Sequence, residues 1–323
     1  MHKSLLPHDW VVSPKMSSHF LSESASTTTN APATRIAYSV GGISFGMSSS
    51  DPDLQLALDG SVLEFETAAG TKCDVEVKVS WTDGIPLPNG KAAFDSGGLW
   101  SAYSEHGGTG FYFQTDFLGA EPYKYAWFSG DYSRGRVLLL RRYFAADVPV
   151  YPLEYPLDEL LMIHRISRGE GIEVHGCGVV TADGTGRLFI GHSGAGKSTS
   201  SRLWLKQPGA RVLSDDRIIV RMHDGVAYMY GTPWHGDAGL AAQASSPIHQ
   251  IFLLQHGAEN EIIPLQSGQA AAEIFTRVFV PHHSAVSLRE TLSFVEKMVS
   301  ALPVARFRFR PDDSAIEEIL RAA

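Results

Sequence analysis

The sequence predicts an α+β fold in two parts, a β-rich first half and a second half that mixes strands and helices. In residues 34–150, short segments alternate apolar and polar residues, which is typical of half-buried strands. In the second half, a glycine-rich segment at 191–196 separates an apolar strand from a helical pattern. Two strands joined by the short turn at 183–186 must run antiparallel, so the second part is predicted as an α/β domain with a mixed sheet.

Length and composition narrow the class of protein. The chain has 323 residues, 44% hydrophobic and 19% charged, which fits a globular protein of two domains. A net charge of −8 argues against a nucleic-acid surface. No run of 18 apolar residues occurs, so no membrane partner is expected. Cys73 and Cys177 are interpreted as core residues, consistent with a reducing cytoplasm.

Three regions are expected along the chain. Residues 1–32 end in a run rich in Ser and Thr and are predicted to be a flexible leader. Residues 33–150 are predicted to form a β-rich domain with a packed antiparallel sheet, which would recognise an acceptor or partner. Its expected strands are 35–40, 62–66, 73–79, 110–114 and 135–140. Residues 151–323 are predicted to be the catalytic domain.

The elements of that second domain follow from periodicity and breakers. A helix is expected at 157–166, and strands at 171–180 and 187–190 flank the short turn. Further expected strands lie at 212–213, 218–222, 226–230, 251–254 and 304–309, with a hairpin between the second and third of them. Helices are expected at 198–206, 268–280 and 287–301 and from about Asp313.

The strongest motif is Gly-His-Ser-Gly-Ala-Gly-Lys-Ser at residues 191–198, a complete phosphate-binding loop. Its glycines let backbone N–H groups cradle a polyphosphate, Lys197 reaches the β- and γ-phosphates, and the Ser198 hydroxyl ligates Mg²⁺. The motif therefore predicts ATP and Mg²⁺ as cofactors. The predicted binding residues are Gly191, His192, Ser193, Gly194, Ala195, Gly196, Lys197, Ser198 and Thr199.

Two adjacent carboxylates, Asp215 and Asp216, follow the expected strand at 212–213. In a Mg²⁺-nucleotide enzyme, one such carboxylate holds the metal and its neighbour accepts a proton from the attacking hydroxyl. Asp215 is assigned here to the metal, although residue order alone does not decide between the two. Arg217 either neutralises the transferring phosphoryl group or pairs with an aspartate.

Other polar residues are weaker candidates. His175 lies on an apolar strand that is expected to pair with the strand entering the loop, so it is either a core residue or a catalytic one. Trp234 and His235, in a turn-rich segment, line a pocket or form a packed corner, and the corner is favoured. Residues 281–284 contain two histidines, but no zinc site is predicted because a third close ligand is missing.

The order of His175, the phosphate loop and the Asp215–Asp216 pair resembles the catalytic domain of the HPr kinase/phosphorylase family, within the phosphoenolpyruvate carboxykinase-like P-loop superfamily. The resemblance spans roughly residues 157–280. It implies transfer of a phosphoryl group from ATP to a protein serine, with His175 assisting and the aspartates sharing metal and base roles. The chain differs at Thr199, where the family has glutamate, and lacks the family's Arg-Gly turn after the hairpin.

The sequence thus predicts an ATP- and Mg²⁺-dependent serine kinase acting on a small protein or peptide, and it leaves a homo-oligomer open. Lys197, His175, Asp215 and Asp216 are its expected catalytic residues. Two alternatives remain: a carboxykinase-like enzyme that grips a small carboxylic acid with Arg277 and Arg217, and a non-catalytic nucleotide-binding partner of a biosynthetic enzyme.

Overall fold

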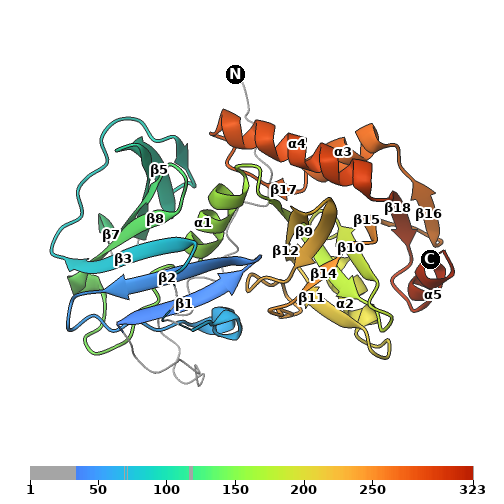
Figure 1. Cartoon of the computed structure of the whole chain (residues 1–323), viewed down its shortest axis with the longest axis horizontal. Coiled ribbons are helices and arrows are strands. Elements are labelled where there is room, and N and C mark those ends of the chain that lie inside the picture. Colours follow the sequence, from blue (N-terminus) through green and yellow to red (C-terminus); the bar gives the residue numbers. More distant parts are fainter. Residues whose placement is uncertain (1–33, 69, 71, 116–118, 323) are drawn as a thin grey trace.

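The computed structural model describes residues 34–68, 70, 72–115 and 119–322. The predicted leader, residues 1–32, lies outside this part of the chain. The described residues form two β-sheets that lie next to each other and five α-helices concentrated in the second half (Figure 1). The α+β class is therefore confirmed. The division into two domains remains a prediction.

The first sheet has eight strands in the order β1-β2-β3-β8-β7-β6-β5-β4. Their bounds are β1 Arg35–Val40, β2 Ile43–Ser49, β3 Val75–Thr82, β4 Phe94–Asp95, β5 Trp100–Glu105, β6 Gly108–Thr115, β7 Gly119–Ser129 and β8 Arg134–Leu140. The expectation of a purely antiparallel sheet is wrong, because β3 runs parallel to both β2 and β8. Residues 50–74 connect β2 to β3, which is long enough for the crossover that parallel strands require.

The strand expected at 62–66 is also wrong: Gly60–Phe65 forms a 3-10 helix. Asp59 caps it by accepting a hydrogen bond from the backbone N–H of Gly60. Val62 and Phe65, three residues apart, are the buried positions. That spacing places both side chains on one face of a helix with three residues per turn, whereas a strand would bury alternate residues.

The second sheet is mixed, as expected, with its main strands in the order β14-β13-β12-β9-β10-β15-β18-β16. The bounds are β9 Ile172–Val180, β10 Gly186–Ile190, β11 Arg211–Ser214, β12 Arg217–His223, β13 Val226–Tyr230, β14 Ser245–Pro247, β15 Gln250–His256, β16 Glu261–Pro264, β17 Val278–Phe279 and β18 Val304–Phe309. β9 and β10 pair antiparallel across the short turn, and β12 and β13 form the predicted hairpin.

The two faces of this sheet bury different cores. The helices are α1 Leu157–Ile166, α2 Lys197–Trp204, α3 Ser267–Phe275, α4 Ala285–Ala301 and α5 Ser314–Arg321. In β10, Leu188 and Ile190 pack with α3 and α4, while Phe189 packs with α2 and α5. α3 and α4 lie across one side of the sheet in Figure 1. The alternation follows from the two-residue period of a strand.

β9 carries its residues to these faces in the same way. Val174 belongs to the core under α3 and α4, and Cys177 to the core under α2. His175, two residues before Cys177, therefore shares the face of α2. Farther along that face, Ile219 of β12 packs with the core of the first sheet, to which α1 also contributes. The face that carries His175 is thus covered by α2 at one end and by α1 and the first sheet at the other.

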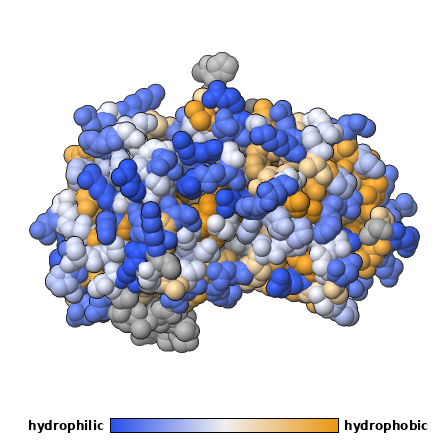
Figure 2. Space-filling model, in the orientation of Figure 1, coloured by the Kyte–Doolittle hydropathy of each residue, from blue (hydrophilic) through white to orange (hydrophobic). Residues whose placement is uncertain are grey.

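The surface is mixed in character. Figure 2 shows hydrophilic and hydrophobic residues interspersed on the face in view. None of the helices in the described part of the chain has the length and apolarity that crossing a bilayer requires.

Candidate functional site

The loop at 191–196 connects β10 to α2 and depends on its glycines. Gly194 and Gly196 have φ values of 77° and 99°, in the left-handed region that side chains disfavour. A Cβ on Gly196 would also lie 2.5 Å from Cζ of Phe309. The sequence therefore adopts a tight turn that places backbone N–H groups ahead of the first turn of α2.

Lys197, the first residue of α2, points back into this loop. Its Nζ donates to the carbonyl oxygens of Gly191 and His192, each at 3.0 Å, and the residue is only 5% exposed. Ser198 and Thr199 follow at the first turn and are half-buried. The loop backbone thus encloses a buried cation beside the N-terminus of a helix, an arrangement that favours anions.

The two adjacent aspartates diverge. They occupy the break between β11 and β12, just after the register of β11 against β9 shifts between Val212 and Ser214. Asp215 is fully buried, and its carboxylate accepts hydrogen bonds from the backbone N–H groups of Gly236, Ala238 and Leu240 at 3.0–3.3 Å. It therefore holds the turn that follows β13.

Asp216 faces His175. Oδ1 of Asp216 lies 2.8 Å from Nε2 of His175, and its other oxygen accepts from Arg217. Burial opposes ionisation of Asp216, but the His175 hydrogen bond and the charges of Arg217 and Lys197 outweigh it and lower the pKa of this carboxyl. Burial, aided by the charge of Lys197, lowers the pKa of His175 as well. The pair is thus an ionised carboxylate and a neutral imidazole, with the shared proton on Nε2 of His175.

Arg217 is held on several sides. Its Nε donates to Oε1 of Glu159 at 2.7 Å, and its guanidinium carbon lies 4.1 Å from the ring centroid of Phe279. Burial disfavours the charge, but Glu159 and Asp216 outweigh it and raise the pKa of Arg217. Of the two roles predicted for Arg217, pairing with an aspartate is the one observed in these contacts.

Sequence reasoning missed Glu159 and Glu173, which complete this charged cluster. Glu173 is fully buried two residues before His175 on β9, and burial together with Glu159 raises its pKa well above the ordinary value. A glutamate in phase with His175 on an apolar strand was a usable signal. No sequence pattern indicated Glu159, because only the packing of α1 brings this residue to Arg217.

β9 brings the loop and the aspartates together. On one side, the N–H of Gly191 donates to the carbonyl of His175 at 3.2 Å; on the other, the N–H of Gly176 donates to the carbonyl of Asp216 at 3.0 Å. The loop at 191–196 and the acidic pair are therefore attached to opposite edges of one strand at the same level.

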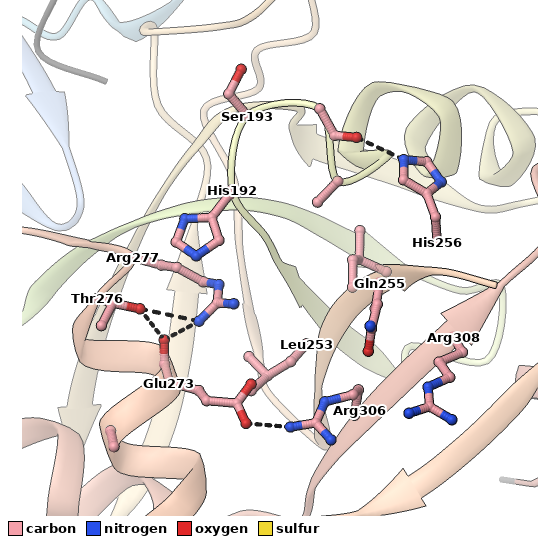
Figure 3. A pocket seen from close by; sticks show the side chains of 14 residues that line it. His192, Ser193, Leu253, Gln255, His256, Glu273, Thr276, Arg277, Arg306 and Arg308 are labelled. Carbon is pink, nitrogen blue, oxygen red and sulfur yellow. Dashed lines mark hydrogen bonds and ion pairs between the residues drawn. The ribbon is translucent and has the colours of Figure 1, made fainter. Parts of the chain in front are cut away.

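Two clefts border this point. The first, which we call the arginine cleft, has a volume of about 800 Å³ and is lined in part by residues 192–195 of the loop (Figure 3). It is lined by His192, Ser193, Gly194, Ala195, Leu253, Leu254, Gln255, His256, Ala272, Glu273, Thr276, Arg277, Arg306 and Arg308. Glu273 pairs with Arg306, whereas Nε of Arg277 is buried without a hydrogen bond in the described structure.

The seam cleft, about 390 Å³, lies between the two sheets on the Asp216 side. It is lined by Asp59, Gly60, Ser61, Val62, Tyr151, Glu154, Tyr155, Asp158, Glu159, Asp216, Arg217, Pro233, Trp234 and His235. Nε2 of His235 lies 2.8 Å from Oγ of Ser61, and Trp234 packs in the core of the first sheet. The turn around Trp234 is therefore both a packed corner and a cleft wall.

The remaining histidine candidates do not cluster around a metal. The ring of His283 lies 5.5 Å from that of His164, centroid to centroid, in an apolar setting. Among the described residues, no group of three or more His, Cys, Asp or Glu side chains is arranged to hold a metal ion.

Comparison with known proteins gives a distant structural likeness. No protein-family model and no curated protein matches the sequence. Among solved structures, the Hpr(Ser) kinase/phosphatase from Coxiella burnetii is similar to 46% of this chain over 94% of its own length, with 16% identity and a TM-score of 0.29. Because the sequence identity and the TM-score are low, this likeness assigns neither a function nor residue roles to the chain.

Proposed function

We propose that the chain is an ATP- and Mg²⁺-dependent phosphotransferase acting on the hydroxyl of a serine in a small protein or peptide. The observation that carries the proposal is the attachment of the phosphate loop and the His175–Asp216 pair to opposite edges of β9 at one level. Phosphoryl transfer needs mainly positioning and charge neutralisation, which these groups supply.

In the proposed reaction, the loop N–H groups and Lys197 bind the β- and γ-phosphates. The acceptor oxygen attacks the γ-phosphorus, the bond to the bridging oxygen of ADP breaks, and the hydroxyl proton passes to Asp216. Neutral His175 donates from Nε2 and holds the Asp216 carboxylate in place. Arg217 anchors the second oxygen of Asp216.

The oxygen donors at the loop fit a magnesium ion. Mg²⁺ takes oxygen ligands, keeps several waters and neutralises phosphate charge when bound. Ser198, half-buried at the first turn of α2, and the phosphates would hold it. Asp215 was the predicted metal ligand, but its buried carboxylate already accepts three N–H groups, so we assign it a positioning role instead.

The test is transfer from γ-labelled ATP to species in native extract, followed by identification of the labelled one. We expect Asp216→Asn to bind Mg-ATP within about threefold of the wild type and to transfer label about 10²- to 10⁴-fold more slowly. Asp224→Asn, an exposed carboxylate in the β12–β13 turn, is the matched control. Tight Mg-ATP binding without any transfer or hydrolysis would indicate the non-catalytic nucleotide-binding module instead.

A second candidate is phosphoryl transfer involving a small carboxylic acid. The arginine cleft favours it, because Arg277, Arg306 and Arg308 line it beside the loop and Arg277 has an unpartnered Nε. Arg217, by contrast, is occupied by Glu159 and Asp216. Turnover of oxaloacetate with ATP by the purified protein, lost in Arg277→Ala, would support this reaction over serine phosphorylation.

A further inference from the structure

The two clefts that border the candidate site have opposite charge. In the arginine cleft, Arg277, Arg306 and Arg308 outnumber the single lining carboxylate, Glu273. In the seam cleft the balance is reversed: the lining carboxylates are Asp59, Glu154, Asp158, Glu159 and Asp216, and the lining Arg or Lys is Arg217. A polyphosphate is therefore favoured on the first side of β9 and disfavoured on the second.

Two of these five carboxylates, Asp59 and Asp158, pair with no Arg or Lys among the described residues. Arg217 contacts Glu159 and Asp216, and Lys124 pairs with Glu154 at 2.8 Å. Asp59 is exposed, and its carboxylate accepts a hydrogen bond from the backbone N–H of Gly60. Burial raises the pKa of Asp158 to about 7, so a cation nearby would favour its ionised form.

Aromatic groups line the same cleft. Tyr155 is 41% exposed, and Tyr151 and Trp234 lie on the wall. Trp234 is only 7% exposed, and its buried Nε1–H faces Asp158 and lowers the pKa of that carboxyl. The cleft thus offers tyrosine rings and carboxylates to a cation.

We propose that the seam cleft binds the acceptor as a peptide segment with a lysine or arginine next to the phosphorylated serine. The basic side chain binds among Asp59, Asp158 and Tyr155. The serine hydroxyl then lies against Asp216, which lines the same cleft. This inference takes the role of the serine from the proposed function, whereas the charge preference rests on the cleft itself.

Entry of the two substrates from opposite flanks of β9 suits the reaction. In-line transfer requires the attacking oxygen and the leaving oxygen on opposite sides of the phosphorus. The phosphate loop is attached to one edge of β9 and Asp216 to the other. A donor at the loop and an acceptor in the seam cleft would therefore approach each other across His175.

The experiment measures binding of three fluorescent peptides of five residues by anisotropy, in the presence of magnesium and a nonhydrolysable ATP analogue. Each peptide has a central serine, flanked on both sides by lysine, norleucine or glutamate. We expect the lysine peptide to bind about tenfold more tightly than the norleucine peptide, and the glutamate peptide most weakly. Asp59→Asn, which keeps the cap on Gly60, should weaken the lysine peptide about three- to tenfold without changing the norleucine peptide.

Asp224→Asn should leave all three affinities unchanged. Equal affinity for the three peptides, or equal effects of the Asp59 and Asp224 substitutions, would overturn the inference. Label transfer from ATP separates it from the proposed function. Preferential binding of the lysine peptide without transfer to any acceptor would support the charge preference of the cleft and contradict the kinase activity. Transfer to all three peptides at equal efficiency would support the kinase activity and contradict the charge preference.

Discussion

Nε2 of His175 lies 2.8 Å from Oδ1 of Asp216, and this contact joins the middle of β9 to the break between β11 and β12. Both side chains lie on the sheet face that α2 and the first sheet cover from opposite ends. The hydrogen bond helps to keep Asp216 ionised despite its burial, because it lowers the pKa of the carboxyl. An ionised carboxylate is thereby present next to the loop at 191–196 at neutral pH.

Replacing His175 is expected to change the pH dependence of the proposed transfer. Without the hydrogen bond, the pKa of Asp216 rises, so His175→Ala should lose activity at a higher pH than the wild type when the solution is acidified. His175→Gln, which can retain an N–H donor, should restore part of the shift. Profiles of kcat/KM against pH measure both. A uniform loss of rate with an unmoved acid limb would show that His175 does not act through Asp216.

Lys197→Met should weaken Mg-ATP binding at least about 100-fold, since it removes the buried cation that the loop encloses. Calorimetric titration with Mg-ATP gives the affinity, and circular dichroism checks that the fold is kept. Lys206→Met, an exposed lysine just after α2 that pairs with Asp313, is the matched control. Similar affinities for the two variants would contradict phosphate binding by this loop.

Asp215→Asn is expected to lower the free energy of unfolding. The substitution removes the charge from a fully buried carboxylate that accepts three backbone hydrogen bonds, and the amide brings N–H groups toward those donors. The free energy of unfolding should fall by about 2–4 kcal/mol, measured by urea denaturation. Asp224→Asn should stay within about 0.5 kcal/mol of the wild type. A stable Asp215→Asn protein that no longer responds to Mg²⁺ would instead restore Asp215 as a metal ligand.

The burial of His164 is expected to lower the free energy of unfolding in acid. Its Nδ1 lies 2.7 Å from the carbonyl of Leu160, its Nε2 is buried without a hydrogen bond in the described structure, and burial lowers its pKa to about 3. Below pH 6.5 the unfolded chain binds a proton at His164 that the folded chain does not. Stability should therefore fall as the pH drops from 6.5 toward 3, by at most about 1.4 kcal/mol per pH unit from this group.

The comparison for His164 is the difference between the wild type and His164→Phe in urea unfolding at pH 7.5, 6 and 5. Phenylalanine fits the aromatic surroundings of Phe111 and Tyr132 and does not titrate. The variant should gain stability relative to the wild type as the pH falls. Parallel curves for the two proteins would mean that His164 accepts a proton in the folded state.

Local sequence patterns predicted many of the helices and strands in the second half of the chain. The helix at 157–166, the strand at 304–309 and the hairpin around residues 223–225 lie where periodicity and turn residues indicated. These elements are determined by near neighbours in the chain. The pairing of β3 with β2 and β8 depends on contacts between distant segments, which no local pattern encodes.

The same limit applies to the site. The spacing after the glycine-rich loop predicted Asp215 and Asp216 as candidate site residues. Their different environments, however, depend on the turn at 236–240 and on His175. Glu159 reaches Arg217 because α1 packs between the two sheets. Tertiary packing therefore determines which of two neighbouring carboxylates meets solvent and which is enclosed.

Alternation along β9 makes the site sensitive to strand slippage. Glu173, His175 and Cys177 share one face, and the intervening Val174 contacts the opposite core. Sliding the strand by one position would invert every side chain. His175 would then enter the apolar layer beneath α4, and Val174 would stand opposite the carboxylate. An insertion or deletion of a single residue within β9 would therefore be far more damaging than most point changes.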